Sequence, residues 1–543
     1  MRSSNFSPLA LSTPVITLVV VSPLIAIFGS AVTTESIALL KHLVDTVIGT
    51  YVTNSLLLML GVGSLTLIIG VPTAWLTSIC EFPGRKVFVW ALLLPLAFPA
   101  YIIAYTYTGL LDYFGPVYTL VRHIVGEERF ADLYVSIRSL PGAIVLFALV
   151  LYPYVYLLSR ISFLEQSSGF IELSRTLGYS MGESFFKVAV PLTRPAIVAG
   201  VSLALMETLA DYGTVQFFGI DTFTTGIIRA FGSYGDASVA AQLSIMLLGF
   251  VGLLMFCEWF SRRKVQYHSA KGKTIHQSKI RLVGKKALLA WLACFLPVLL
   301  GFLLPALILL KWTLFDAEYD LSRFAVLVWN TVRLGATAAA IAVILSVVLG
   351  YAKRTVSTRV VASMVAVSGL GYAIPGAIIA VGVITPLVWL DLRLIDLFRS
   401  ALDIEVGLIL SGSIFALLFA YTVRFLAISL NAVQTGLQRI RPSMDYSARV
   451  LGCRPWEVLK RVHLPVMRAS LITAFLIVFV DVLKELPATL ILRPFNFNTL
   501  AVRAYELASD ERLIDAALPS LTIVLTGIVP VIILSKTMTR ERR

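Results

Sequence analysis

Cysteine and histidine are scarce in this sequence of 543 residues. The four cysteines are far apart and form no CxxC pair: Cys80, Cys257, Cys294 and Cys453. This spacing supports neither a disulfide framework nor a zinc site. None of the five histidines stands in an HExxH pattern, and no nucleophile motif is present. The sequence therefore gives little support to a membrane-embedded enzyme.

A phosphate-binding loop is missing as well. The segment Gly272-Lys273-Thr274 resembles the end of such a loop, but Tyr267 stands where the first glycine is required. Without Walker motifs, the chain is not expected to hydrolyse ATP. We also expect no cofactor and no metal site in this chain.

Charged residues make up only 14% of the sequence, whereas they are about a quarter of an average soluble protein. Hydrophobic residues reach 58% and the mean hydropathy is +0.87. This composition excludes a soluble globular protein and indicates an integral membrane protein. The net charge of +14 would suggest nucleic-acid binding only if it were clustered on a soluble domain.

Hydrophobic runs of about 20 residues, long enough to cross a bilayer as helices, recur along the whole chain. We place twelve spans at residues 9–30, 54–79, 87–111, 141–158, 192–210, 239–260, 287–310, 326–350, 360–390, 406–430, 466–483 and 517–534. The first run is long for a signal peptide and completes six spans in its half. The predicted fold is all-α, with pseudo-symmetric six-helix halves at residues 1–260 and 287–543 and a linker at 261–286.

Basic residues indicate the orientation, because Lys and Arg prefer the cytoplasmic side of a membrane. With the N-terminus inside, most of the 45 Lys and Arg residues fall in cytoplasmic segments and most of the 31 Asp and Glu residues fall outside. Both termini are therefore predicted to be cytoplasmic. The basic linker then lies beside anionic lipid headgroups, and binding of nucleic acid is not expected.

A polar stretch between the fourth and fifth spans of each half is repeated at an offset of 274 positions. The first elbow, residues 172–191, reads ELSRTLGYSMGESFFKVAVP, and the second elbow, residues 446–465, reads YSARVLGCRPWEVLKRVHLP. A repeat kept in register over this length indicates two similar halves. On the charge-derived topology both elbows face the cytoplasm.

Each elbow is expected to contain two short helices that meet at a glycine, Gly178 or Gly452, in a left-handed or tightly packed corner. Ser180 followed by Glu183 predicts a capping box at the start of the next helix. In the second elbow, Pro455 suits the first helical turn. Pro191 and Pro465 are predicted to end the elbow helices and begin the following spans.

The elbows resemble the pattern E-A-A, three residues, G, nine residues, I-x-L-P of permease subunits of binding-protein-dependent ABC importers. The first elbow has Glu172, Leu173, Ser174, Gly178, Val188, Val190 and Pro191 at these positions. The second has Tyr446, Ser447, Ala448, Gly452, Val462, Leu464 and Pro465, so that a tyrosine replaces the acidic residue. The resemblance implies a type I importer permease whose elbows couple to an ATPase.

The resemblance also implies the partners and the location. They are two copies of a separate ATPase, which uses ATP and Mg, and a periplasmic substrate-binding protein, with membrane lipid around a multi-pass protein of the bacterial inner membrane. The coupling residues carried over are Glu172, Ser174, Gly178, Pro191, Ala448, Gly452 and Pro465. The rival class is a secondary transporter driven by an ion gradient, which would need no ATPase.

Acidic residues inside a membrane are costly and are therefore functional candidates. Glu207 and Asp481 occupy equivalent places near the ends of two spans, and Asp211 and Glu485 follow them. If the pairs face each other, they would favour a cationic substrate. The structural alternative is that Asp481 pairs with Lys484 and Glu485 with an arginine. Tyr212 is either a hard oxygen ligand for a ferric ion or an anchor at the membrane interface.

Two further stretches of sequence resemble a more specific group of permeases. Residues 207–231, ETLADYGTVQFFGIDTFTTGIIRAF, and residues 483–520 are similar to fused twelve-span permeases of periplasmic ferric-iron importers. Permeases for thiamine, phosphonate-type solutes and polyamines are related at lower similarity. The resemblance thus implies iron(III) as the transported substrate, with these solutes as alternatives.

Overall fold

The computed structural model describes residues 8–31, 41–126, 134–166, 174, 176–262, 279–356 and 358–540. Within them the chain forms two compact units. One unit comprises Met1–Thr46, Gly226–Met246 and Tyr319–Arg503, and the other comprises Val47–Thr225, Leu247–Glu318 and Ala504–Arg543. Each unit is built largely from one half of the sequence.

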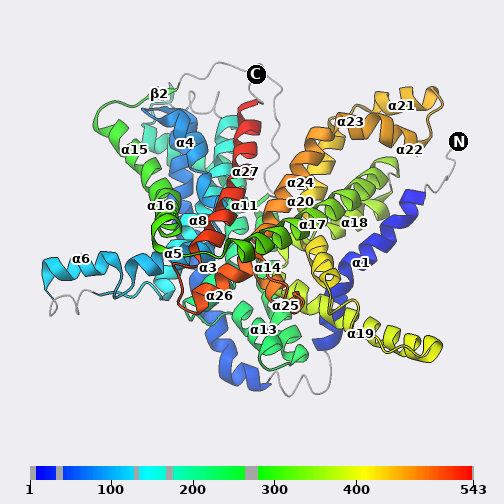
Figure 1. Ribbon diagram of the computed structural model, residues 1–543. Helices are drawn as coiled ribbons and strands as arrows, with labels where there is room; N and C mark the ends of the chain where they lie inside the picture. The colour runs from blue at the N-terminus through cyan, green and yellow to red at the C-terminus, as the bar shows by residue number, and fades with distance from the viewer. Residues whose placement is uncertain are drawn as a thin grey trace. The chain divides into compact units, whose positions relative to one another are not determined.

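Helices dominate the described residues (Figure 1). Those before the linker are α1 (Pro8–Ala31), η1 (Val44–Ile48), α3 (Gly49–Ile79), α4 (Arg85–Ala91), η2 (Leu94–Ala97), α5 (Ala100–Leu111), α6 (Pro116–Val125), α8 (Leu140–Gln166), α10 (Met181–Glu183), η3 (Ser184–Ala189), α11 (Val190–Ala210), α12 (Gly213–Phe217), α13 (Phe223–Gly232) and α14 (Ala237–Arg262).

Those after the linker are α15 (Lys285–Val298), η4 (Leu299–Leu303), α16 (Leu304–Lys311), η5 (Trp312–Asp316), α17 (Leu321–Thr355), α18 (Arg359–Ser368), η6 (Gly371–Ala373), α19 (Gly376–Leu402), α20 (Ile414–Gln438), α21 (Pro442–Val450), α22 (Pro455–Val458), η7 (Leu459–His463), α23 (Leu464–Val466), α24 (Arg468–Leu483), α25 (Pro487–Leu492), α26 (Leu500–Ser509) and α27 (Ala517–Arg540).

Strands are limited, in the described part, to a parallel pair of two residues each, β1 (Cys80–Glu81) and β2 (Ile280–Arg281). The pair joins the end of the predicted linker to the end of α3. Glu81 supports it, because its carboxylate lies 3.2 Å from Arg85 and 3.7 Å from Lys279. The last residues of the linker are therefore held at the end of α3, a contact that the sequence did not predict.

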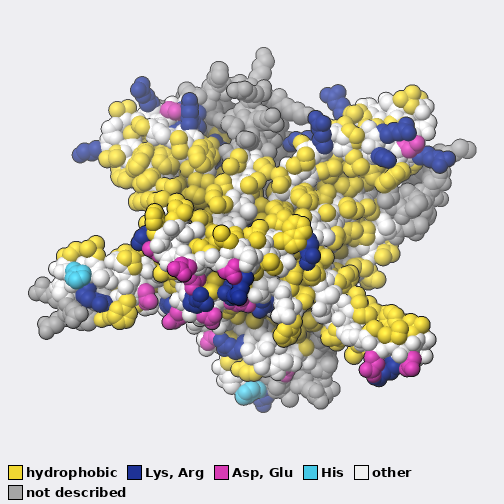
Figure 2. All heavy atoms as spheres, in the orientation of Figure 1, with side chains coloured by type: hydrophobic (Ala, Val, Ile, Leu, Met, Phe, Trp, Pro, Cys, Tyr) yellow, Lys and Arg dark blue, Asp and Glu magenta, His cyan; other side chains and the backbone are white. Residues whose placement is uncertain are grey.

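Helices of membrane-spanning length coincide with most of the predicted hydrophobic runs. Among the described residues, nine helices are long and apolar enough to cross a membrane, or up to eleven if each of two bent pairs is one span. The shorter apolar helix Ala517–Ile533 lies at the twelfth predicted position. Large apolar side chains cover the exposed surface of α15 and α16 (Figure 2), for example Leu289 and Leu307 at 65% and 61% exposure. Such surfaces suit contact with lipid.

Two predicted spans, residues 87–111 and 360–390, are each broken rather than continuous. In the first, α4 and η2 meet α5 and α6 at a bend of 90°. In the second, α18 ends at Ser368 and α19 begins at Gly376 after the short turn η6. Both later helices start directly after a proline, Pro99 or Pro375. Proline disfavours the helical conformation in the residue that precedes it, which explains both breaks.

Each unit also contains helices from the other half of the sequence. The N-terminal helix α1 packs on α17, α18 and α19 (Figure 1), and the hydroxyl groups of Thr17 and Ser368 are 3.0 Å apart across that contact. In the other unit, α15 packs on α3, and α16 and α27 pack on each other. The compact units therefore do not coincide with the sequence repeats 1–260 and 287–543, which stay a prediction.

Candidate functional site

Both elbows turn at their glycine in the left-handed conformation that the sequence predicted. Gly178 has φ = +87° and Gly452 has φ = +85°. A side chain at either position would meet nothing within 4 Å, so backbone conformation rather than close packing favours glycine there. Of the two alternatives, the left-handed corner is therefore the correct one.

The hydrogen bonds that close the corners are equivalent. The N–H of Tyr179 donates to the carbonyl of Ser174 at 3.0 Å, and the N–H of Cys453 donates to the carbonyl of Ala448 at 3.0 Å. Each pair spans five residues, as in the Schellman motif that ends a helix at a glycine. Ser174 and Ala448, carried over by resemblance, thus mark the same structural position in the two elbows.

The helix that follows each corner is also capped in the same way. Ser180 and Glu183 form the predicted capping box. At the equivalent place, the N–H of Arg454 donates to the carboxylate of Glu457 at 2.8 Å, and Pro455 occupies the first turn as predicted. One turn later each glutamate meets a basic residue: Lys187 lies 2.9 Å from Glu183, and Arg461 lies 3.8 Å from Glu457.

Pro191 stands at the beginning of the following span as predicted, but neither proline ends the helical turns before it. In the first elbow the helical turns run from α10 through η3 into α11, with Pro191 near the start of α11. In the second, Pro465 lies in α23, and the break comes after it, where a bend of 75° precedes α24. A wider π-helical turn, η3 or η7, directly precedes each proline-containing helix and accommodates a residue that cannot donate a backbone hydrogen bond.

Large apolar side chains are exposed on both elbows. In the first elbow Leu177 and Phe186 are 69% and 71% exposed. In the second elbow Val450 and Leu451 are 87% and 83% exposed. Lys and Arg side chains gather around the second elbow, over α21 to α23 (Figure 2). Apolar groups surrounded by polar ones are typical of surfaces that bind a protein partner.

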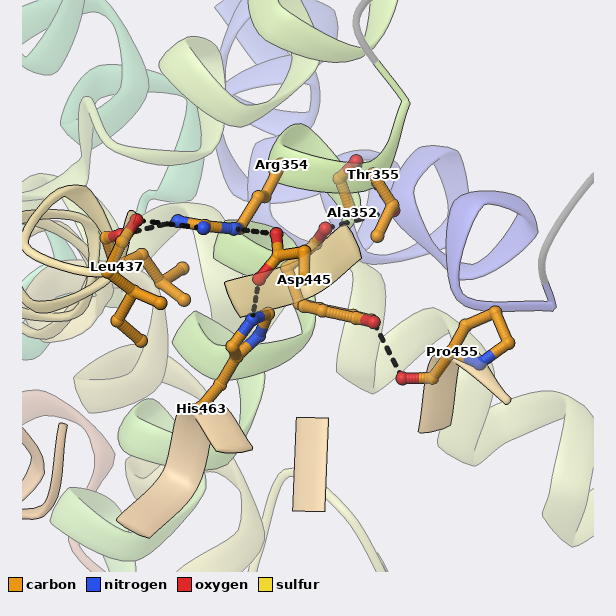
Figure 3. A network of polar contacts seen from close by, with 9 residues as sticks. Ala352, Arg354, Thr355, Leu437, Asp445, Pro455 and His463 are labelled. Carbon is orange, nitrogen blue, oxygen red and sulfur yellow. Dashed lines mark hydrogen bonds and ion pairs between the residues drawn. The ribbon is translucent and has the colours of Figure 1, made fainter. Parts of the chain in front are cut away.

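Polar contacts join the second elbow to the end of α17 (Figure 3). Arg354 donates from Nε to Asp445 at 2.8 Å and from Nη2 to the carbonyl of Ile440 at 2.9 Å. The other carboxylate oxygen of Asp445 lies 2.7 Å from Nε2 of His463. Burial would raise the pKa of Asp445, but the hydrogen bonds from Arg354 and His463 outweigh it and hold that pKa below its ordinary value.

Aromatic contacts join the first elbow to α3. The ring centroids of Trp75, on α3, and Phe185, on η3, are 5.3 Å apart in an edge-to-face arrangement. Trp75 also contacts Phe163 of α8 at 5.5 Å. Beneath the corner, the hydroxyl groups of Ser174 and Ser184 are 2.8 Å apart and both residues are buried. Glu172, the acidic residue of the predicted motif, lies outside the described residues.

Two of the predicted substrate-path acids cap short helices that follow the fifth span of each half. Asp211 accepts a hydrogen bond from the N–H of Thr214 at 2.8 Å, at the start of α12. Glu485 accepts from the N–H groups of Ala488 and Thr489, both at 3.1 Å, at the start of α25. Their carboxylates therefore have a structural role in addition to any role in transport.

The pairing alternative raised from the sequence is present in the structure. Lys484 lies 2.8 Å from Asp481, and Arg424 of α20 lies 3.2 Å from Glu485. Glu207 lies on α11 and is half-buried. That the acids of the two halves face a common substrate path stays a prediction. Tyr212 is buried, and its hydroxyl lies 3.2 Å from that of Tyr505.

Sequence reasoning missed Arg354, Asp445 and His463. Asp445 is one residue before the second elbow as delimited by the repeat, and Arg354 is 91 positions away from it. The three residues are not repeated in the first half, so the internal repeat gave no signal for them. In the part of the chain that the structure describes, no group of three or more His, Cys, Asp or Glu residues could hold a metal ion.

Comparison with known proteins finds a family of membrane transport components and several related permeases. Residues 65–266 match the family described as binding-protein-dependent transport system inner membrane component. The Fe(3+)-transport system permease protein FbpB 2 of Haemophilus influenzae is 25% identical over 491 residues, which cover 89% of this chain and 89% of that protein. This match extends over both halves.

Two permeases of Escherichia coli K12 match shorter parts of the chain. The molybdenum transport system permease protein ModB is 28% identical over 221 residues, which cover 38% of this chain and 93% of that protein. The sulfate transport system permease protein CysT is 30% identical over 152 residues, which cover 28% of this chain and 51% of that protein. Nearly all of ModB thus corresponds to well under half of this chain, as expected for a fusion of two permease units.

Proposed function

Because this chain is a permease of the binding-protein-dependent transport family and a multi-pass inner membrane protein, we propose that it forms the membrane channel of an ATP-driven iron(III) importer. A periplasmic binding protein delivers the substrate to the outer loops. The chain itself moves the substrate and carries out no chemistry. Both termini and both elbows lie on the cytoplasmic side.

One observation carries this proposal: the elbow occurs twice with the same geometry. The corners at Gly178 and Gly452, the hydrogen bonds that close them and the capping glutamates are all equivalent. Two elbows with equivalent geometry suit two copies of one ATPase subunit, each of which binds one elbow. The ATPase uses ATP and Mg, and its closure moves the elbows.

Exposed apolar residues on the elbows support a protein contact at this place. Leu177, Phe186, Val450 and Leu451 have more than two thirds of their surface accessible. Removing apolar surface of this kind from water, by covering it with a partner, favours association. The coupling residues Ser174, Gly178, Pro191, Ala448, Gly452 and Pro465 shape the backbone that presents them, with Glu172 as the acidic member of the first elbow.

Iron(III) is favoured over other substrates by the extent of similarity. The permease named for Fe(3+) transport matches along 89% of this chain, whereas those named for molybdenum and sulfate match 38% and 28%. Thiamine, polyamines and phosphonate-type solutes remain the alternatives. The carboxylates of Glu207, Asp211, Asp481 and Glu485 are the candidates for the path of a cation.

The test is reconstitution of the chain in proteoliposomes with its ATPase and its binding protein. We expect uptake of radioactive iron(III) that requires internal ATP, and no ATP hydrolysis by the chain alone. Thiamine, a polyamine and 2-aminoethylphosphonate serve as competing substrates. Uptake driven by an ion gradient without the ATPase would instead establish a secondary transporter. ATP-dependent uptake of another solute, without iron uptake, would overturn only the substrate assignment.

A further inference from the structure

We propose that Arg354, Asp445 and His463 form a linkage through which the second elbow moves helix α17, and that the first elbow, in the residues that the structure describes, engages α3 through the aromatic contact between Trp75 and Phe185. The two ATPase contacts would then be unequal. The inference rests on the proposed function, because it concerns how movement of an elbow reaches the spans.

Arg354 is placed where three elements meet. It stands at the end of α17, and its guanidinium donates to the carbonyls of Leu437 and Ile440 at the end of α20 as well as to Asp445 in α21. A planar guanidinium that is held by several acceptors has little freedom to turn. Movement of α21 is therefore transmitted to α17 and α20 together.

Asp445 extends the linkage to the base of the next span. One carboxylate oxygen receives Arg354 at 2.8 Å and the other lies 2.7 Å from Nε2 of His463, which ends η7 (Figure 3). The His463 side chain is 1% exposed and those of Arg354 and Asp445 are both 17% exposed. Charge-assisted hydrogen bonds with this degree of burial are stronger than surface ion pairs.

A second contact fastens the other side of the elbow. The hydroxyl of Tyr351, one turn before Arg354 on α17, donates to the carbonyl of Pro455 at 2.6 Å, and its ring contacts that of His463 at 5.3 Å between centroids. Beneath these contacts, Val433, Leu437, Ile440 and Met467 form a buried apolar cluster. The elbow therefore packs on this apolar cluster. It is joined to α17 both before and after its corner at Gly452.

The first half has different residue types at the corresponding positions. At the repeat offset of 274 positions, Arg354, Asp445 and His463 correspond to Cys80, Ile171 and Ala189. None of these three side chains can form a carboxylate–guanidinium pair. The first elbow instead reaches α3 through the rings of Trp75 and Phe185. An apolar contact tolerates sliding between its partners, whereas hydrogen bonds fix direction and distance.

This difference makes coupling at the second elbow sensitive to charge. Asp445→Asn keeps the shape of the side chain and removes its charge, and Arg354→Lys keeps the charge but cannot reach all three acceptors. Lys353→Gln is the matched control, because Lys353 is the exposed neighbour on α17 that donates to Gln434 at 3.2 Å and has no hydrogen bond to Asp445 or His463.

The experiment compares these variants with the wild-type chain in proteoliposomes that contain the ATPase and the binding protein. The readout is the amount of ATP hydrolysed for each substrate imported. Losing a hydrogen bond to a charged group costs about 1.5–3 kcal/mol, or roughly tenfold or more in an equilibrium. We therefore expect Asp445→Asn to lower uptake about tenfold at unchanged ATP hydrolysis, with Arg354→Lys intermediate and Lys353→Gln like the wild type.

A second readout needs no ATPase. Hydrogen exchange of the purified chain in lipid nanodiscs reports the amide groups of residues 442–458. We expect faster exchange there in Asp445→Asn, no change in Lys353→Gln, and no change in the first elbow of either variant. A folded Asp445→Asn protein with wild-type exchange and a wild-type ratio of ATP to substrate would overturn the linkage. If the wild-type chain shows no ATP-driven uptake, the proposed function fails, and the hydrogen-exchange result still decides whether the linkage exists.

Discussion

Arg424 lies 3.2 Å from Glu485 within one compact unit, and the side chains are only 11% and 2% exposed. The arginine comes from α20, and the glutamate stands between α24 and α25. Glu485 also accepts two backbone N–H groups at the start of α25. The pair therefore fixes the turn that follows a membrane span.

Arg424→Gln should destabilise the protein strongly, because it leaves a buried carboxylate without its cation. Removing one partner of a buried ion pair costs about 3 kcal/mol or more. The measurement is the thermal unfolding midpoint of the detergent-solubilised protein, with Glu485→Gln and the double variant alongside. Because the two residues act as a pair, the double variant should lose less than the sum of the single losses. Additive losses would show that the two side chains act independently.

Replacement of Gly178 or Gly452 by valine should abolish coupling and leave membrane insertion intact. A residue with a side chain costs about 1–2 kcal/mol in the left-handed conformation, and a β-branched residue is particularly unsuited to it. Asparagine, which tolerates this conformation, should retain more uptake than alanine or valine. The assay is ATP-driven uptake with the amount of inserted protein measured in parallel.

Gly182→Ala is the control for these variants, since Gly182 is also exposed and has nothing within 4 Å but does not have a positive φ. It should transport like the wild type. Uptake that survives valine at both corners would refute the coupling role of the elbows.

Asp391→Ala should loosen the segment after α19. The buried carboxylate accepts hydrogen bonds from the N–H groups of Ile409, Leu410 and Ser411 at 3.1, 2.8 and 2.7 Å. Leaving such donors unsatisfied costs about 1–3 kcal/mol each. The amide groups of residues 409–411 should therefore exchange faster with deuterium, whereas Asp396→Ala, which removes an exposed carboxylate of the same helix, should not change them.

Glu207→Gln combined with Asp481→Asn should lower uptake of iron(III) about tenfold or more, by the loss of charged contacts, and should scarcely affect a neutral solute. Lys484→Gln separates the two roles of Asp481, because it removes the ion-pair partner at 2.8 Å and keeps the carboxylate. If the lysine variant loses as much uptake as Asp481→Asn does, the ion pair matters and the acid is not part of the path.

Hydrophobic runs predicted the helices well, because a span must satisfy its backbone within itself and therefore shows in composition alone. The breaks in the spans at residues 87–111 and 360–390 were missed. Prolines at 99 and 375 were visible in the sequence, but an apolar run has the same composition whether it is straight or bent. The packing of α1 on α17 to α19 could not be predicted either, since all these helices are similarly apolar.

The elbow was predicted in more detail than the rest of the candidate site. Gly178, Gly452 and the Ser180–Glu183 pair act through local backbone geometry, which depends on neighbours in the sequence. Arg354, Asp445 and His463 come from three separate helical elements and have no equivalents in the first half. Only the tertiary structure brings them together. Pro191 begins its span as predicted, but it does not end the elbow helix, because the sequence does not reveal the wider helical turn before it.

The packing of α1 on helices of the second half has a consequence for biosynthesis. The N-terminal helix leaves the ribosome first, yet the surface on which it packs, including Ser368 of α18, is made hundreds of residues later. Domains of other proteins commonly fold in order of synthesis, but here α1 can pack on its partners only after the second half has been inserted. A chain interrupted within the linker would therefore yield two fragments that mature only when both are present in the same membrane.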